Sequence, residues 1–160
     1  MRTGVKLKYW FLRHYWWILG AALIASIVFL VHRDEQLGTG ATVVGALLSL
    51  AYFVQKQKLE ELRLFRELFK EFNDRYDQMN EKLALIVEGP ETELTQDERQ
   101  LLVDYFNLCG EEYLYFIKGY VDPMVWAAWY NGMTAIVSTP RIQKLWHTEK
   151  RTGSYYGLPL

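Results

Sequence analysis

Two long runs without charged residues constrain the fold of this chain more than any other feature. Residues 15–31 (YWWILGAALIASIVFLV) and residues 37–55 (LGTGATVVGALLSLAYFVQ) contain no Asp, Glu, Lys or Arg. As helices they would extend ~26–28 Å, close to the ~30 Å hydrocarbon layer of a bilayer. A buried core helix normally carries a polar stripe, and neither run has a charged residue to form one. We therefore expect two membrane-spanning helices.

The short connection between the runs predicts how these helices are arranged. Only residues 32–36 separate them, which favours a tight turn and an antiparallel hairpin. A cleaved signal peptide is the alternative for the first run, because basic residues precede it. That alternative is disfavoured because a convincing small-x-small cleavage motif is missing and a second apolar run follows at once.

The charge of the chain is unevenly distributed, although its averages resemble those of a soluble globular protein. The 160 residues are 51% hydrophobic and carry a formal net charge of −1, which gives no indication of disorder or nucleic-acid binding. Residues 1–55 contain five basic and two acidic residues (5 − 2 = +3), and the remainder carries 13 basic and 17 acidic residues (−4). Because basic residues flank the open end of the hairpin, the positive-inside rule predicts that both termini are cytoplasmic.

Two sets of residues in the hairpin have the chemistry of membrane helices. Trp and Tyr rings prefer the headgroup level, and small residues let helix backbones approach closely. The expected interface residues are Tyr9, Trp10, Arg13, Tyr15, Trp16, Trp17 and Tyr52. The expected helix-packing residues are Ala22, Ser26, Gly38, Thr42, Gly45 and Ser49. These small residues either pack the hairpin against itself or also present a face for self-assembly.

The second apolar run should continue into a long cytoplasmic helix, because residues 46–88 contain no Gly or Pro. After residue 55 the apolar residues follow a heptad with spacings of 3 and 4, which is typical of a coiled-coil seam. The seam consists of Leu62, Phe65, Phe69, Phe72, Tyr76, Met79, Leu83 and Ile86. It is interpreted either as an intermolecular coiled coil or as the face that later helices cover, and both can hold at once.

Three short helices are predicted in a C-terminal cap over residues 89–160. Gly89-Pro90 ends the long helix, and Thr95 and Glu98 form a capping-box motif for a helix to about residue 118. Asp-Pro and Thr-Pro pairs at 122–123 and 139–140 begin two further helices, to about 137 and 150. The expected core or partner surface comprises Tyr105, Phe106, Tyr113, Phe116, Trp126, Trp129, Tyr155 and Tyr156. The aromatic tail at 152–160 either docks into a groove of the cap or binds a partner.

The sequence lacks the common motifs for phosphate, dinucleotide and catalytic zinc binding. The sequence has no phosphate-binding glycine loop, no dinucleotide-binding glycine motif and no H-E-x-x-H. Cys109 is expected to be a small core residue. Glu111 and Glu112 are adjacent, so they point in different directions on a helix and are expected to be solvated or paired with Lys118 or Arg99. We therefore expect neither an enzyme nor a cofactor.

Three segments of the cap carry a resemblance to a known group of proteins. They are residues 105–113 (YFNLCGEEY), residues 118–122 (KGYVD) and residues 126–133, with Trp126, Trp129, Asn131-Gly132 and Met133. The chain resembles small helical proteins of bacterial antiphage loci, and its layout is similar to the two-helix membrane effectors of retron defence systems. The segments cover about residues 95–147, and the rest is similar in architecture alone.

The resemblance implies a membrane-damaging effector that a partner holds inactive until infection, and it transfers no catalytic residues. The partner would be a cytoplasmic protein or a reverse-transcriptase ribonucleoprotein, with no direct nucleic-acid site on this chain.

Together these observations predict an all-α protein of the bacterial inner membrane. Its parts would be a transmembrane hairpin (1–55), a stalk helix (56–88) and a cytoplasmic helical cap (89–160). We expect homo-oligomers that perturb the lipid bilayer, since an uncharged hairpin alone cannot line a polar pore. The alternative is a passive membrane anchor or scaffold whose cap binds a protein or ribonucleoprotein.

Overall fold

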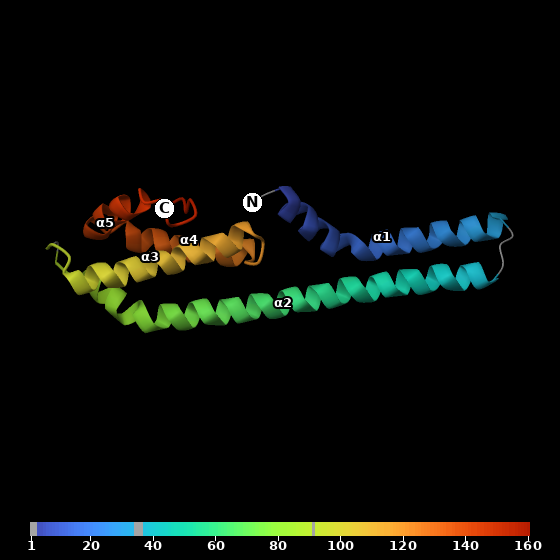
Figure 1. Cartoon of the computed structure of the whole chain (residues 1–160), viewed down its shortest axis with the longest axis horizontal. Coiled ribbons are helices and arrows are strands. Elements are labelled where there is room, and N and C mark those ends of the chain that lie inside the picture. Colours follow the sequence, from blue (N-terminus) through green and yellow to red (C-terminus); the bar gives the residue numbers. More distant parts are fainter. Residues whose placement is uncertain (1–2, 34–36, 91) are drawn as a thin grey trace. The chain divides into compact units, whose positions relative to one another are not determined.

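The computed structural model describes residues 3–33, 37–90 and 92–160, and the regular secondary structure of these residues is all α-helix, as predicted (Figure 1). The five helices are α1 (Thr3–Arg33), α2 (Leu37–Glu88), α3 (Gln96–Ile117), α4 (Pro123–Val137) and α5 (Pro140–Lys150). The chain divides into two compact units, which we call the hairpin unit (residues 3–63) and the cap unit (residues 64–160). Helix α2 contributes residues 37–63 to the first and 64–88 to the second.

In the hairpin unit, α1 and the first part of α2 run antiparallel (Figure 1). A side-chain carbon added at Gly40, near the start of α2, would lie 3.7 Å from Leu30 Cδ1, near the end of α1. At the other end, the Lys58 ammonium lies 5.2 Å from the centre of the Tyr15 ring. These two contacts fix the pairing of the helices in the predicted hairpin.

The helices of the cap unit begin where the sequence signals place them. The Thr95 hydroxyl accepts a hydrogen bond from the Glu98 backbone N–H at 3.3 Å, and the Thr95 N–H donates to Glu98 Oε2 at 2.7 Å. The Asp122 carboxylate caps α4 by accepting from the Met124 N–H at 2.7 Å. These side chains satisfy backbone donors that have no partner within the helix.

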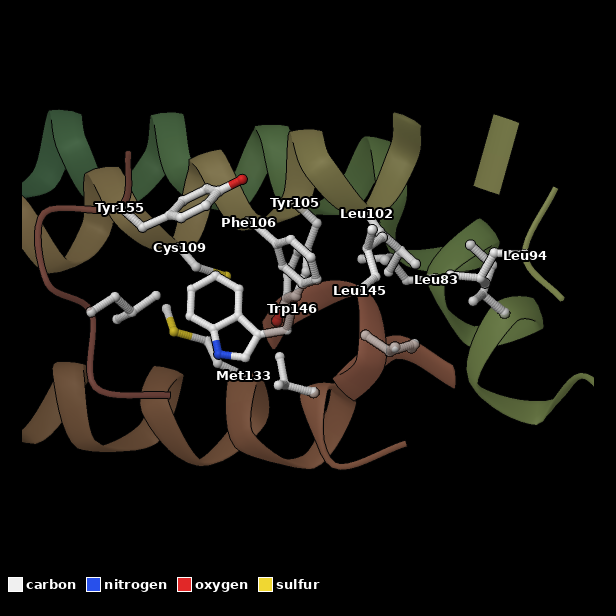
Figure 2. Close-up of a cluster of buried hydrophobic side chains, with 14 of the residues drawn as sticks. Leu83, Leu94, Leu102, Tyr105, Phe106, Cys109, Met133, Leu145, Trp146 and Tyr155 are labelled. Carbon is white, nitrogen blue, oxygen red and sulfur yellow. The ribbon is translucent and has the colours of Figure 1, made fainter. Parts of the chain in front are cut away.

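The cap core lies between α2, α3 and the two last helices. Trp146 of α5 is buried at its centre, 5.0 Å from the Phe106 ring and 5.1 Å from the Tyr155 ring (Figure 2). Its indole N–H donates to the Leu160 carbonyl at 3.0 Å, so this large polar aromatic is buried with its donor satisfied. A second, smaller cluster joins Leu68 and Phe72 of α2 to Leu108 of α3.

One ion pair joins α5 to the beginning of α3. Arg141 donates from Nη2 to Glu98 Oε1 at 2.7 Å and from Nη1 to the Pro90 carbonyl at 2.8 Å. The Arg141 side chain is almost fully buried, whereas its Nε has no hydrogen-bond partner among the described residues. Glu98 therefore serves twice, as the capping-box carboxylate and as the partner of Arg141.

The C-terminal tail docks into the cap through Tyr155 and Leu158, which is one of the two roles predicted for it. Tyr155 is 4% exposed, and its side chain packs against Gly110, where an added Cβ would lie 3.4 Å from Tyr155 Cα. Leu158 is also buried, and the Tyr130 hydroxyl donates to the Pro159 carbonyl at 2.9 Å. Tyr156, in contrast, is 53% exposed.

Replacing Tyr155 by Ala should destabilise the cap by about 3–5 kcal/mol, since it removes a buried aromatic side chain that packs against both Phe106 and Trp146. Thermal unfolding of the full chain in a nonionic detergent, followed by near-ultraviolet circular dichroism, measures the effect. The matched control is Tyr156→Ala, which removes the exposed neighbouring ring and should leave the midpoint almost unchanged. Equal midpoints for the two variants would contradict the docked position of the tail.

Candidate functional site

The outer surface of the hairpin unit is apolar along most of both helices. Helix α1 from Trp10 to His32, and α2 from Gly38 onward, are long and apolar enough to cross a membrane. Only 11% and 6% of their most apolar stretches are buried within the structure. Exposed residues include Ile24, Val28 and Phe29 on α1 and Leu48 and Phe53 on α2. Since water disfavours contiguous apolar surface of this size, a surface of this kind marks a contact with lipid or with another protein.

Most of the predicted interface residues lie on this surface. Trp10, Arg13, Trp16, Trp17 and Tyr52 are exposed, with Trp17 at 81%. Tyr15 is instead buried within the hairpin, below the Lys58 ammonium. The side chain of Tyr9 lies outside the described residues.

The predicted small residues lie on two different faces. Ala22 and Ser26 belong to a half-buried row on α1, opposite a half-buried row on α2 that includes Gly40 and Ala51. The α2 residues Gly38, Thr42, Gly45 and Ser49 are all exposed, and nothing lies within 4 Å of a Cβ added at either glycine. At 100° per residue, these four positions point about 180° away from the half-buried row of α2. We call them the small-residue face.

The small-residue face needs no polar partner in order to pack in an apolar environment. The Thr42 hydroxyl donates to the Gly38 carbonyl at 3.0 Å, and the Ser49 hydroxyl donates to the Gly45 carbonyl at 2.8 Å. Because each hydroxyl proton is used within the helix, burial of this face in lipid or against another helix leaves no donor unsatisfied.

The heptad seam is divided between covered and exposed positions. Phe72, Leu83 and Ile86 are buried against the other helices of the cap unit, and Tyr76 and Met79 are partly buried there. Phe69 stacks on Trp129 at 5.7 Å between ring centres, and Phe65 is half-buried with its ring 5.8 Å from that of Phe69. Leu62 is 63% exposed. The seam from Phe69 to Ile86 therefore packs against the chain's own cap. This is one of the two interpretations predicted for the heptad.

The predicted cap residues, Tyr156 excepted, lie in the aromatic core. Phe116 and Trp126 stack with their rings 4.8 Å apart, and Tyr113 lies 5.5 Å from Trp126. Trp129 meets Phe72 edge-on at 5.9 Å. Trp146 is not among the residues predicted for this core, although the i, i+3 and i+4 spacing of Ile142, Leu145 and Trp146 marks the buried side of α5.

The surroundings of Glu111 and Glu112 differ from the prediction that these side chains are solvated or paired with Lys118 or Arg99. Glu111 accepts two hydrogen bonds from Arg75 of α2, at 2.6 and 3.2 Å. Glu112 is only 7% exposed, because the next residue on a helix is turned by about 100° and here points toward α2 and α4. Burial raises the pKa of Glu112 to about 8, while the nearby Arg75 acts in the opposite direction.

Cys109 is buried among these residues, as predicted, and burial raises the pKa of its thiol. Among the described residues, no three His, Cys, Asp or Glu side chains are grouped so as to hold a metal ion. Comparison with family models, curated proteins and solved structures finds no match to this chain.

The cap should lose stability as pH rises from about 4.5 to about 8. Over this window the folded state keeps a proton on Glu112 that the unfolded state releases, so the free energy of unfolding falls with pH and levels off above pH 8. The slope is at most about 1.4 kcal/mol per pH unit. Thermal unfolding across this pH range measures it.

Glu112→Gln should flatten this pH dependence, since the amide does not titrate. Asp104→Asn, which changes an exposed carboxylate on the same helix, should retain it. An unchanged slope in Glu112→Gln would contradict the buried titration.

Proposed function

We propose that the chain is a two-span protein of the bacterial inner membrane that acts as a non-enzymatic effector. In this proposal it oligomerises, perturbs or permeabilises the bilayer in antiphage defence, and is held inactive by a cytoplasmic partner, either a protein or a reverse-transcriptase ribonucleoprotein. The observation that carries the proposal is the exposed apolar surface of α1 and the first part of α2. Lipid is the environment that covers such a surface at the lowest free energy.

The proposed orientation places both termini in the cytoplasm. Lys56, Lys58, Arg63 and Arg66 follow the second span, whereas Arg33 is the only basic residue between residues 32 and 36. Such an excess of Lys and Arg on one side is retained on the cytoplasmic face. The cap would then lie in the cytoplasm, where its partner is expected.

Assembly in the membrane is proposed to use the small-residue face. Helices in lipid associate by close packing, because lipid tails provide no hydrophobic drive between them. The open space around Gly38 and Gly45 lets another backbone approach, and the intrahelical hydrogen bonds of Thr42 and Ser49 permit it. Several hairpins brought together in this way would perturb the bilayer, whereas a single uncharged hairpin cannot line a polar pore.

Expression of the full chain in bacteria without its partner should depolarise the membrane and admit an otherwise impermeant dye. Gly38→Leu with Gly45→Leu should suppress both effects and reduce the cross-linked oligomers, since two large side chains block close packing. Gly20→Leu is the matched control on α1, where an added Cβ also meets nothing within 4 Å, and it should remain active. Intact membranes at high expression of the wild-type chain would contradict the effector proposal.

A passive anchor or scaffold is the second candidate, and the covered seam favours it. Phe72, Leu83 and Ile86 are occupied by the chain's own cap, so they are not available for an intermolecular coiled coil. Replacing both spans by an unrelated hairpin distinguishes the candidates. A scaffold should keep its function after this exchange, whereas an effector that acts through residues of the spans should lose it.

A further inference from the structure

A small pocket opens in the cap unit between α2, α3 and α4. It has a volume of about 220 Å³ and is lined by Tyr76, Tyr105, Glu112, Trp129, Gly132 and Met133, among others. This volume is below the ~300–1,000 Å³ of most small-molecule pockets, so it suits a ligand of a few heavy atoms. An added Cβ at Gly132 would meet no atom within 4 Å, which shows that this wall is open.

The buried carboxyl group of Glu112 lines this pocket. No described residue donates a hydrogen bond to it, although its side chain is among the pocket walls. Arg75 is the nearby cation, and its two terminal nitrogens are both bound to Glu111. A buried charge in this situation is costly unless a counter-ion enters.

Among the titratable groups around Glu112, Arg75 is the base, and it is paired with Glu111; the others are acids. Helix α2 presents Arg75 and Tyr76, α3 presents Tyr105, Cys109 and Glu111, and the lining residues of α4 carry no charge. Burial raises the pKa values of Tyr76, Tyr105 and Cys109, so these groups stay neutral at physiological pH. Once it is ionised, Glu112 is therefore the group that carries negative charge in the pocket, and no cation among the described residues is bound to it.

Aromatic rings complete the walls and are held in place by their neighbours. Trp129 stacks on Phe69 at 5.7 Å and meets Phe72 edge-on at 5.9 Å, while the Tyr76 and Tyr105 rings are 6.3 Å apart. The negative faces of such rings attract an organic cation, most strongly where water is excluded.

We propose that this pocket binds the alkylammonium group of a small organic cation, with the Glu112 carboxylate as counter-ion and the Tyr76, Tyr105 and Trp129 rings around its apolar part. Inorganic cations fit less well, because the pocket offers rings instead of a shell of oxygen ligands. The residues that line the site all belong to the cap unit, and its occupation does not depend on the proposed membrane activity.

The charge state of Glu112 gives this site a characteristic pH dependence. The ammonium binds the carboxylate form, and the Glu112 pKa of about 8 means that the carboxyl is largely protonated at lower pH. Affinity should therefore rise about tenfold per pH unit up to pH 8 and level off above it, while an alkylamine stays protonated to about pH 10.

Calorimetric titration of the full chain in nonionic detergent with butylammonium chloride tests the proposal at constant ionic strength. Saturable binding is expected, with n-butanol, the neutral analogue, at least about tenfold weaker. Nα-acetyl-lysine methylamide carries the same group on a peptide unit. Tighter binding of that compound would assign the ammonium to a protein lysine, and tighter binding of butylammonium would assign it to a free amine.

Two variants locate the binding. Glu112→Gln should weaken butylammonium at least about tenfold at pH 8.5 and abolish the pH dependence, and Gly132→Leu should block the pocket without touching the carboxylate. Asp104→Asn, which removes an exposed charge elsewhere on α3, should bind as the wild type does. Circular dichroism confirms that each variant is folded. Equal binding by Glu112→Gln, equal binding of butanol, or no saturation at millimolar butylammonium would overturn the proposal.

Discussion

Covering the apolar surface of the two N-terminal helices is the constraint on which the rest of this protein depends. Each helix is long enough to cross a bilayer and buries little of its most apolar stretch against the chain itself. The antiparallel pairing covers only one narrow row on each helix, so the remaining surface needs lipid or other chains. Three features of the hairpin sequence agree with this requirement: the basic residues at the open end, the absence of charge inside the runs, and the exposed small-residue face.

A different constraint acts on the cap unit, which must bury many aromatic rings in a small volume. It does so by using residues 64–88 of α2 as one wall, with α3 packed on that wall and α4, α5 and the tail closing the far side. The result is a core in which Phe106, Trp146 and Tyr155 meet at 5–6.3 Å between ring centres. Among the described residues of this unit, Glu112 is the carboxylic side chain that is buried, an exception to the rule that such groups stay at the surface, and our proposal of a ligand begins from it.

The helices could be predicted from the sequence because their signals are local. Capping residues such as Thr95 and Asp122, and the Pro residues after Asp122 and Thr139, act within a few residues, and the observed bounds agree with them within one or two residues. The partners of Glu111 and Glu112 could not be predicted, since Arg75 lies 36 residues away from Glu111 along the chain. The heptad likewise predicted an apolar face, whereas only the three-dimensional arrangement decided that Phe72 and Leu83 face their own cap. The burial of Tyr15 could not be predicted either, because its contact with Lys58 depends on how the two helices of the hairpin pair.

The central claim, that lipid covers the apolar hairpin, is tested most directly by cysteine labelling in native membranes. Single cysteines replace Val28, Leu48 or Lys82, all exposed in the structure, in a chain whose Cys109 has been changed to Ser. A water-soluble maleimide is added to membranes that are open on both sides. Position 82 should react, while positions 28 and 48 should react only after the membranes are dissolved in sodium dodecyl sulfate. Comparable reaction at all three positions before dissolution would contradict the account.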